Sequence, residues 1–482
     1  MKKWSIFKKS QAAVLAVVMS ISLLTACSGS SEKSADTGTT ESFGMKDSDF
    51  PASDAASGLD ASSSAEIMGD SESTGGEKAA EGSDVAGESA KLYDKALSEV
   101  KTDEKRVSSE DGVSESTDSD NPKAEAGLLT AGRWNDNDNW GYFTNLVNKG
   151  AIAFPSYGLN PCNRISVTVK NSEGTPLPNQ TVTLEDSDGK TIWEAVSDKT
   201  GITYLFYDDN DKPARINAIK DDGSKESFDV NIEKNNDKKN NKKNDSEDDS
   251  NNNSPNNSQT NPVTDNEFEI TLDMTPSKYT KMDIMFIMDA TGSMTDEMTF
   301  LQEDFSKITR EVGTENIRYS VNFYRDEGDD YVTKCFDFSQ DIDKIQKNIN
   351  KQSATGGGDT PEAVSQILDE SIHSSSWDKD SVKLAFLIFD APPHAETSEK
   401  IYEAVKKSSE MGVHFIPVVS SNAERDTELF GRALAICTNG EYVFLTDDSG
   451  IGDSHLEPII GDYTVEPLYD IIINIIKEYH NQ

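Results

Sequence analysis

An apolar segment at residues 282–288 ends abruptly in a cluster of oxygen-bearing side chains. The segment has the composition of a buried β-strand, and it leads directly into Asp289, Thr291 and Ser293. Carboxylate and hydroxyl oxygens are hard donors, and a hard divalent cation such as Mg2+ prefers oxygen ligands in near-octahedral geometry. The pattern therefore predicts a cation site at the point where a buried strand meets solvent.

Two later segments complete this pattern. A Gly-rich loop at residues 356–362 carries Thr360, and a second apolar segment at residues 384–389 ends in Asp390. In this order the three segments resemble the metal-ion-dependent adhesion site of a von Willebrand factor A (vWA) domain, and the resemblance covers residues 280–482. Asp359 is an alternative to Thr360 at the loop position. The resemblance implies that Mg2+ or Mn2+ is held by Asp289, Thr291, Ser293, Thr360 and Asp390, and that an acidic side chain of a protein partner binds the metal.

Strands and helices alternate through residues 280–482. Apolar segments at 282–288, 318–324, 332–338, 383–389, 413–419 and 442–445 predict strands, and helical spacing predicts helices at 297–312, after Pro361 and at 464–479. Such alternation is typical of a parallel sheet covered on both faces. We therefore expect an α/β domain with a doubly wound, mostly parallel, Rossmann-like sheet. Ligands of such sheets lie beyond the carboxyl ends of the strands, where Asp289 and Asp390 are expected.

Residues 1–26 have the features of a bacterial lipoprotein signal peptide. A lysine-rich start precedes an apolar stretch at residues 12–24 that is too short for a stable transmembrane helix. Residues 24–27 resemble a lipobox, which implies that Cys27 is acylated. Because each buried CH2 contributes about 0.8 kcal/mol, two or three acyl chains hold a protein on a lipid bilayer. We expect a lipid anchor on the extracytoplasmic face of the cell membrane; an ordinary secretory signal with a coincidental cysteine is the alternative.

The composition of the chain is uneven. The formal net charge is -41 and only 34% of the residues are hydrophobic. Residues 27–124 are dominated by Ser, Glu, Asp, Gly and Ala, which bury too little apolar surface to offset chain entropy, so we expect a disordered acidic tether. The acidity also argues against nucleic acid as a partner, because nucleic-acid binding requires a basic surface.

Two further regions lie between the tether and residue 280. Residues 125–164 contain Trp134 and Trp140, which we expect to pack onto the next domain; a calcium loop at Asp136 and Asp138 is the alternative, although the glycine it requires is missing. Residues 165–275 alternate with period two between Asp/Gly turns. They resemble Ig-like or carboxypeptidase-regulatory-like domains, which predicts a small β-sandwich. Residues 235–261 form an Asn-rich low-complexity stretch, expected to be a loop of that sandwich.

The sequence offers no motif for catalysis. Ser293 has no motif-matched histidine, and neither Gly-x-Ser-x-Gly nor His-Glu-x-x-His occurs. We therefore expect a surface-exposed binding or adhesion protein that is not an enzyme. The alternatives are a structural subunit of an envelope assembly, in which the metal only stabilises the domain, and a metal-dependent hydrolase.

Some residues keep more than one interpretation. His394 and His455 can be solvated loop histidines, or can form a second metal site with Asp453. Three cysteines remain besides Cys27, and an odd number cannot all pair within one chain. Buried free thiols are expected, and a disulfide is left open. These cysteines are Cys162, Cys335 and Cys437.

Overall fold

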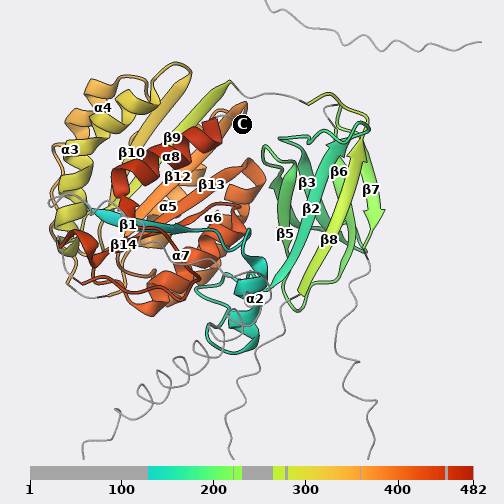
Figure 1. The fold of residues 1–482 in the computed structure, drawn as a ribbon, viewed down its shortest axis with the longest axis horizontal. Coiled ribbons are helices and arrows are strands. Elements are labelled where there is room, and N and C mark those ends of the chain that lie inside the picture. Colours follow the sequence, from blue (N-terminus) through green and yellow to red (C-terminus); the bar gives the residue numbers. More distant parts are fainter. Residues whose placement is uncertain are drawn as a thin grey trace, which may run out of the picture. The chain divides into compact units, whose positions relative to one another are not determined.

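The computed structural model describes residues 129–220, 222–230, 264–276, 280–358, 360–450 and 454–480, all of which fall within one compact unit of the chain. Their elements form an α/β domain and a group of seven strands at residues 163–272 (Figure 1). The predicted signal peptide (1–26), tether (27–124) and Asn-rich loop (235–261) lie outside the described residues and stay predictions. No described helix is long and apolar enough to span a bilayer.

The α/β domain contains an eight-stranded sheet within the described residues, in the order β11-β10-β9-β12-β13-β14-β1-β15. β9, β10, β12, β13 and β14 are mutually parallel, whereas β11, β1 and β15 are antiparallel additions at the two edges. The predicted α/β fold with a mostly parallel sheet is confirmed. The bounds are β1 (Thr130–Trp134), β9 (Lys281–Asp289), β10 (Ile317–Tyr324), β11 (Thr333–Lys334), β12 (Ser381–Phe389), β13 (Val413–Val419), β14 (Tyr442–Thr446) and β15 (Glu466–Pro467).

Helices cover both faces of this sheet, because alternate side chains of each buried strand point to opposite faces. Phe286 of β9 packs with Phe305 in the core under α3, α4 and α8. Its neighbour Ile287 belongs to the core under α5, α6 and α7. The bounds are α3 (Thr295–Val312), α4 (Ile342–Ile349), α5 (Val364–His373), α6 (Ser398–Met411), α7 (Arg425–Cys437) and α8 (Leu468–His480).

Two elements at the edges are shorter than the sequence pattern predicts. The strand expected at residues 332–338 is only β11, because the backbone N–H of Phe336 donates to the side chain of Asn322, 2.8 Å away, instead of to a neighbouring strand. The helix expected from residue 464 begins at Leu468, because Glu466 and Pro467 pair with β1 as β15.

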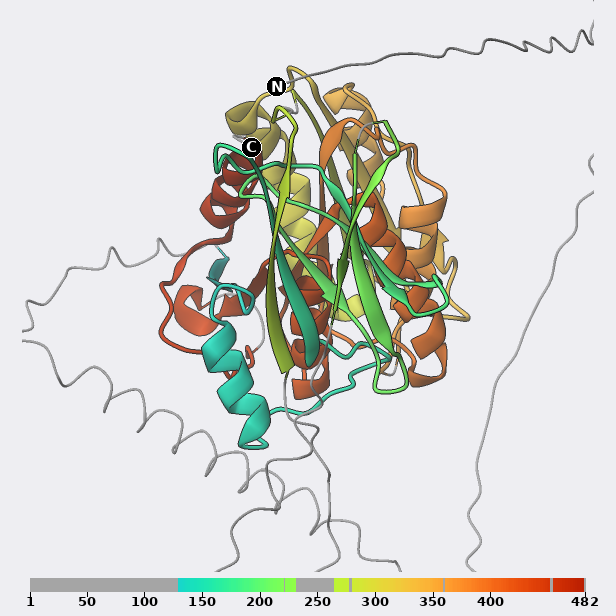
Figure 2. The same ribbon diagram turned by 90° about the vertical axis from the view of Figure 1, so that its right-hand side faces the viewer.

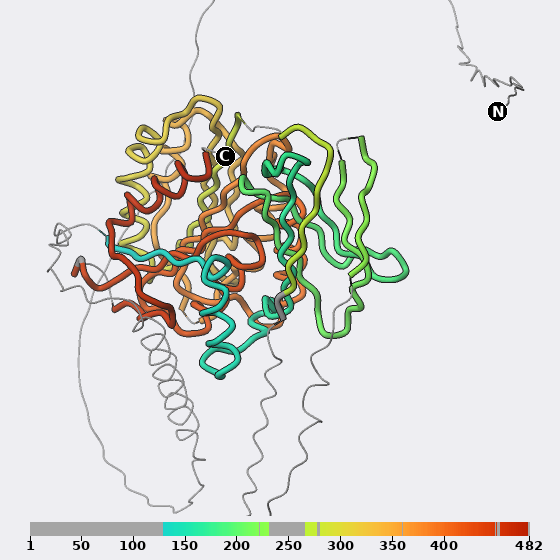
Figure 3. Tube along the Cα trace, turned by 45° about the vertical axis from the view of Figure 1, so that its right-hand side comes forward, coloured from blue at the N-terminus to red at the C-terminus, as the bar shows by residue number. Residues whose placement is uncertain are grey.

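The segment before the seven strands belongs in part to the α/β domain. β1 pairs along its whole length with β14, and its Trp134 packs against Gly461 (Figure 3, where the turquoise segment lies among orange and red ones). The next element, α2 (Trp140–Asn148), starts at Trp140, whose ring lies under the Arg164 guanidinium at 3.5 Å. Trp134 and Trp140 were expected to pack onto the following domain; Trp140 contacts Arg164 of that domain, whereas Trp134 lies on the C-terminal sheet.

The seven strands form two sheets around a shared core, in the orders β5-β2-β8 and β4-β3-β6-β7 (Figure 2). Val167, Leu184, Trp193 and Leu205 are buried in this core. The arrangement agrees with a small β-sandwich, and the likeness to Ig-like or carboxypeptidase-regulatory-like domains stays a prediction. The bounds are β2 (Asn163–Asn171), β3 (Thr181–Asp186), β4 (Thr191–Val196), β5 (Ile202–Phe206), β6 (Pro213–Ile219), β7 (Lys225–Asp229) and β8 (Thr264–Leu272).

The sandwich packs against α6 of the α/β domain. The indole N–H of Trp193 donates to Ser409 Oγ at 3.0 Å within a buried contact. α6 ends at Gly412, which has a φ of +68° and approaches Val196 so closely that a Cβ there would lie 3.3 Å from the valine Cβ. Glycine is favoured here because it alone adopts this left-handed conformation freely.

Candidate metal centre

Asp289 ends β9 at the carboxyl edge of the sheet, and its side chain is fully buried. Its Oδ1 accepts two hydrogen bonds from Thr291, from the backbone N–H at 2.9 Å and from Oγ1 at 2.7 Å. Its Oδ2 is buried without a hydrogen bond of normal geometry among the described residues, although the Tyr324 hydroxyl interacts with the carboxyl and lowers its pKa. Since buried polar atoms nearly always have a partner, this oxygen fits a ligand such as a cation.

The two hydroxyls of the motif lie beside this carboxylate. Thr291 is buried, and its Oγ1 lies 3.4 Å from Ser293 Oγ. Ser293 is exposed, in the 3-10 turn η3 (Gly292–Met294) that precedes α3. In this motif Asp289 and Thr291 are thus buried, whereas the hydroxyl of Ser293 lies at the surface.

Asp390 follows β12, the neighbour of β9, and is 8% exposed. Burial raises the pKa of Asp390, and a hydrogen bond from Ser293 opposes that shift. Burial, followed by the negative charge of Asp390, raises the pKa of Asp289 to about 7. The two carboxyls therefore lie close enough to repel each other, and a cation between them would relieve that repulsion.

The Gly-rich loop is docked against the Asp289 motif by backbone hydrogen bonds. The N–H of Thr355 donates to the carbonyl of Ala290 at 3.0 Å, and the N–H of Gly292 donates to the carbonyl of Gly356 at 3.1 Å. These two bonds hold the loop beside the motif, and the Thr291 side chain lies against Gly357 of the same loop.

A carboxylate from the loop after β10 fixes the Gly-rich loop from the other side. Asp329 Oδ2 accepts from the backbone N–H of Gly357 at 2.8 Å. Gly356 has a φ of +87°, and a Cβ there would lie 2.4 Å from Asp329 Oδ1. Position 356 therefore requires glycine for both its conformation and this close approach.

Thr360 is exposed on this loop. Within the described residues, no hydrogen bond joins its hydroxyl to the other four predicted ligands. The structure thus brings Asp289, Thr291, Ser293 and Asp390 together, whereas Thr360 lies on the loop that docks through Thr355 and Gly356. Asp359, the alternative loop ligand, lies outside the described residues.

Glu362 is a third acid near this centre, and the sequence analysis did not single it out. It is 4% exposed, and its Oε2 is buried without a partner among the described residues. Burial, then the charges of Asp289, Asp326 and Asp390, raise the pKa of Glu362 to about 9. Glu362 directly follows the Thr360-Pro361 pair of the predicted loop, but no residue next to it in the chain marks it as buried.

A buried hydrogen-bond chain begins at the first turn of α3. Glu297 is 1% exposed, and its Oε1 accepts from Ser421 Oγ at 3.1 Å. Ser421 Oγ also lies 3.1 Å from His455 Nε2, and His455 Nδ1 lies 2.8 Å from Asp447 Oδ1. The order Ser421, His455, Asp447 is that of a hydrolytic triad. However, Ser421 is only 4% exposed, and the 220 Å3 cavity beside His455 and Asp447 is not lined by it.

The two histidines considered for a second metal site have different partners in the structure. His394 Nε2 lies 2.9 Å from Asp326 Oδ1, whereas His455 contacts Asp447. Asp453 lies outside the described residues. Among the residues that the structure describes, no three His, Cys, Asp or Glu side chains gather as a metal cluster. The predicted centre differs from such a cluster, because it combines two acids with hydroxyls.

The cysteines in the described part of the chain are free. Cys162 and Cys437 are buried and Cys335 is exposed. Burial raises the pKa of the Cys162 thiol to about 12. This thiol therefore stays protonated at neutral pH.

Comparisons with known proteins agree with this fold. Residues 283–451 match the family model of the von Willebrand factor A domain. The match spans the motif after β9, the Gly-rich loop and Asp390. The C-terminal part of the chain is therefore a von Willebrand factor A domain.

Two individual proteins show partial similarity. A segment of 214 residues is 26% identical to an ariadne-like RING finger protein, R811, of Acanthamoeba polyphaga mimivirus; it covers 40% of this chain and 20% of that protein. This chain thus matches only about a fifth of the relative's length. The crystal structure of a conserved hypothetical protein, BatB from Bacteroides thetaiotaomicron, aligns over 42% of this chain and 100% of its own, with 11% identity and a TM-score of 0.31.

Proposed function

We propose that this chain is a binding protein of the cell surface, whose vWA domain engages an acidic group of a protein partner through Mg2+ or Mn2+. The ligands would be Asp289, Thr291, Ser293, Thr360 and Asp390. The observation that carries the proposal is the buried, unpaired Oδ2 of Asp289. A vWA domain supports a role in protein interaction or adhesion, and the partner and the metal are proposals.

The donor set suits a hard divalent cation. Asp289 and Asp390 carry charge, and the hydroxyls of Thr291 and Ser293 are neutral oxygen donors beside them. A bound cation would supply the charge that offsets the two acids and a coordination position for a carboxylate of the partner. Ser293 is exposed, so the hydroxyl side of the centre is the side that a partner can approach.

Glu362 has a different part in this proposal. Its raised pKa keeps it protonated at neutral pH, so it adds no negative charge beneath the two aspartates. A proton there limits the charge of the centre to the two acids near the metal. With two anions rather than three, a cation keeps enough positive charge to attract an outside carboxylate.

We propose that the chain is held on the extracytoplasmic face of the cell membrane by acylated Cys27. The lipobox and the apolar stretch before it support this location. Replacing Cys27 with Ala should release the protein from the membrane or leave an unprocessed precursor. Metabolic labelling with a palmitate analogue is the measurement, and equal labelling of wild type and Cys27→Ala would contradict the anchor.

Replacing Thr360 with Ala should weaken partner capture while the protein stays folded. The exposed Thr360 hydroxyl makes no hydrogen bond to the other predicted ligands, so its loss leaves the buried part of the centre intact. The measurement is capture of envelope proteins by immobilised wild type and Thr360→Ala, each with Mg2+ and with EDTA, alongside thermal unfolding.

The two readouts separate the proposal from its structural alternative. If the metal binds the partner, capture should depend on Mg2+ and Thr360→Ala should reduce it. The melting temperature of the variant should change little. A purely stabilising metal predicts no Mg2+-dependent capture and a lower melting temperature for the variant. Thr355→Ala is a matched control, since Thr355 lies on the same loop and docks through its backbone N–H.

The hydrolase alternative rests on one observation, the chain of contacts from Ser421 through His455 to Asp447. The Ser421 hydroxyl also contacts the Glu297 carboxylate and is almost completely buried. A nucleophile must reach its substrate, so this arrangement favours a structural role for Ser421. We therefore propose a protein that is not an enzyme.

A further inference from the structure

A cavity of about 360 Å3 lies between the sandwich and the α/β domain. Asn179, Val196 and Asp198 line it from the sandwich, and Lys383, Glu410 and His414 line it from the α/β domain. Small-molecule sites occur preferentially between domains and occupy about 300–1,000 Å3. Lys383 and His414 lie near the amino ends of β12 and β13, so the cavity is at the edge of the sheet opposite Asp289 and Asp390.

Lys383 is an unusual residue for a central strand. It is 5% exposed, and among the described residues its ammonium group donates one hydrogen bond, to the carbonyl of Ser381 at 2.9 Å. An ammonium group has three N–H donors. Burial lowers the pKa of Lys383, since the charged form is costly where water is excluded. A buried lysine with donors to spare is normally matched by an anion.

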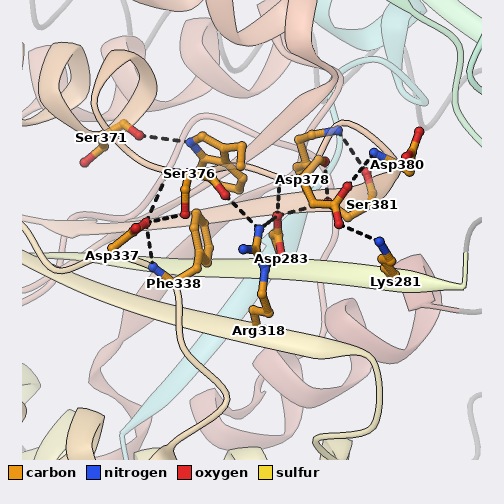
Figure 4. A network of polar contacts seen from close by, with 12 residues as sticks. Lys281, Asp283, Arg318, Asp337, Phe338, Ser371, Ser376, Asp378, Asp380 and Ser381 are labelled. Carbon is orange, nitrogen blue, oxygen red and sulfur yellow. Dashed lines mark hydrogen bonds and ion pairs between the residues drawn. The ribbon is translucent and has the colours of Figure 1, made fainter. Parts of the chain in front are cut away.

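The acids around Lys383 already pair with other cations. The Asp283 carboxylate receives both arms of the Arg318 guanidinium, at 2.8 and 2.7 Å (Figure 4). Asp378, also labelled in Figure 4, pairs with Lys281 at 2.8 Å. The third, Asp380, pairs with Lys379 at 2.7 Å.

The acids that line the cavity are engaged as well. Asp198 Oδ1 accepts from the backbone N–H of Thr200 at 2.8 Å and of Ile202 at 3.0 Å. Glu410 pairs with Lys407. Lys383 itself forms no ion pair with these acids within the described part of the chain.

A second donor, in the wall of the cavity, is also unused. Asn179 Nδ2 is buried and has no hydrogen-bond partner among the described residues. Its backbone N–H donates to the carbonyl of Ser197 at 2.8 Å, which holds the residue at the cavity wall. A charged donor and a neutral donor, both short of acceptors, thus line one cavity.

We propose that this interdomain cavity binds a small molecule with a carboxylate or phosphate group, whose oxygens accept hydrogen bonds from Lys383 Nζ and Asn179 Nδ2. Such an anion pairs the buried ammonium group and supplies the acceptor that the amide lacks. Residues of both domains contact the ligand, so the bound ligand also links the sandwich to the α/β domain. It is independent of the metal centre.

The test is calorimetric titration of acetate, succinate and inorganic phosphate into the full-length protein at constant ionic strength. The buffer is passed over a chelating resin, so that no carboxylate can bind through a metal at Asp289. We expect succinate or phosphate to bind in the millimolar range or tighter, and the stronger of the two identifies the anionic group.

Two variants probe the donors. Lys383→Met keeps the length of the side chain and should weaken binding about tenfold or more, the loss expected for a hydrogen bond to a charged group. Asn179→Gly removes the amide and suits the φ of 62° at this position, and it should weaken binding by a smaller factor. Lys190→Met is the matched control, because Lys190 is an exposed lysine that does not line the cavity, and it should leave the affinity unchanged.

Thermal unfolding gives a second readout. Without an anion, Lys383→Met should melt at a higher temperature than wild type, because it removes an unpaired buried charge. A bound anion should raise the melting temperature of wild type but not of Lys383→Met. The proposal is overturned if none of the three anions binds, or if wild type and Lys383→Met bind them equally.

Discussion

Replacing Asp289 with Ala should weaken Mg2+ binding by more than about 100-fold, exceeding the 10–100-fold effect of losing an outer-shell partner of a metal. The substitution removes one of the two acids and the unpaired Oδ2. The measurement is calorimetric titration of Mg2+ or Mn2+ into the full-length protein. Asp296→Ala is the control, since Asp296 is an exposed acid in the first turn of α3. Equal affinity for wild type and Asp289→Ala would disprove the site.

The same change should alter how the stability of the metal-free protein depends on pH. Folding raises the pKa of Asp289 from 3.8 to about 7 and that of Glu362 from 4.5 to about 9. The folded state then holds protons that the unfolded chain releases, so stability is greatest below about pH 4 for these groups and falls as pH rises toward 9. Asp289→Ala should make the loss of stability up to about pH 7 smaller. Thermal unfolding across this pH range is the measurement.

This pH dependence also distinguishes a metal ligand from a turn-forming residue. If Asp289 only accepted hydrogen bonds from Thr291, its loss would destabilise the protein at every pH. If Asp289 instead serves to hold a cation, metal-free Asp289→Ala should be as stable as metal-free wild type, or more stable, at pH 8. Saturating Mg2+ should reverse that order, because only wild type gains stability from binding.

Removing the Arg432 guanidinium should lower the free energy of unfolding by about 3–5 kcal/mol, the usual effect of leaving a buried charge without its partner. Arg432 is completely buried and contacts Asp136 through Nε and Nη2, both at 2.8 Å. Its Nη1 contacts Glu428 Oε1 at 3.1 Å. Arg432→Met would leave two buried acids, and urea unfolding followed by circular dichroism is the measurement.

Two further variants make this prediction specific. Arg133→Met removes an arginine whose ion pair with Glu478 is only partly buried, so it should cost less than Arg432→Met, about 1 kcal/mol. Adding Asp136→Asn to Arg432→Met should restore part of the loss, because it removes one uncompensated charge. If Arg432→Met and Arg133→Met were equally mild, the buried pair would have no role in joining residue 136 to α7.

Local sequence patterns predicted the parallel sheet well. Residues 282–288 and 383–389 are apolar enough for strands covered on both faces, and Asp289 and Asp390 stand directly after them. The docked loop was also located, because glycines mark positions where the backbone adopts a positive φ and approaches closely, as Gly356 does against Asp329.

Other features depend on partners that are remote in sequence. β1 is a five-residue strand containing Gly132, and its partner β14 is more than 300 positions away, so no local periodicity marks it. A calcium loop at Asp136 was left open as an alternative because the arginine that neutralises this acid, Arg432, lies far along the chain on α7. Glu362 was missed because its burial, and hence its raised pKa, comes from surrounding segments rather than its neighbours in the chain.

The position of β1 has a mechanical consequence. Thr130 lies opposite Thr446, at the carboxyl end of β14, so the chain enters the sheet at the same edge as Asp289. If the proposed anchor held the N-terminal side and the proposed partner pulled on the metal centre, tension would act across the β1–β14 ladder from its first pair. Its hydrogen bonds would then break one after another rather than together. The load would bypass the sandwich, because β1 precedes its strands in the chain and β9 follows them. Strain on β1 would reach α7 through the contact between Asp136 and Arg432.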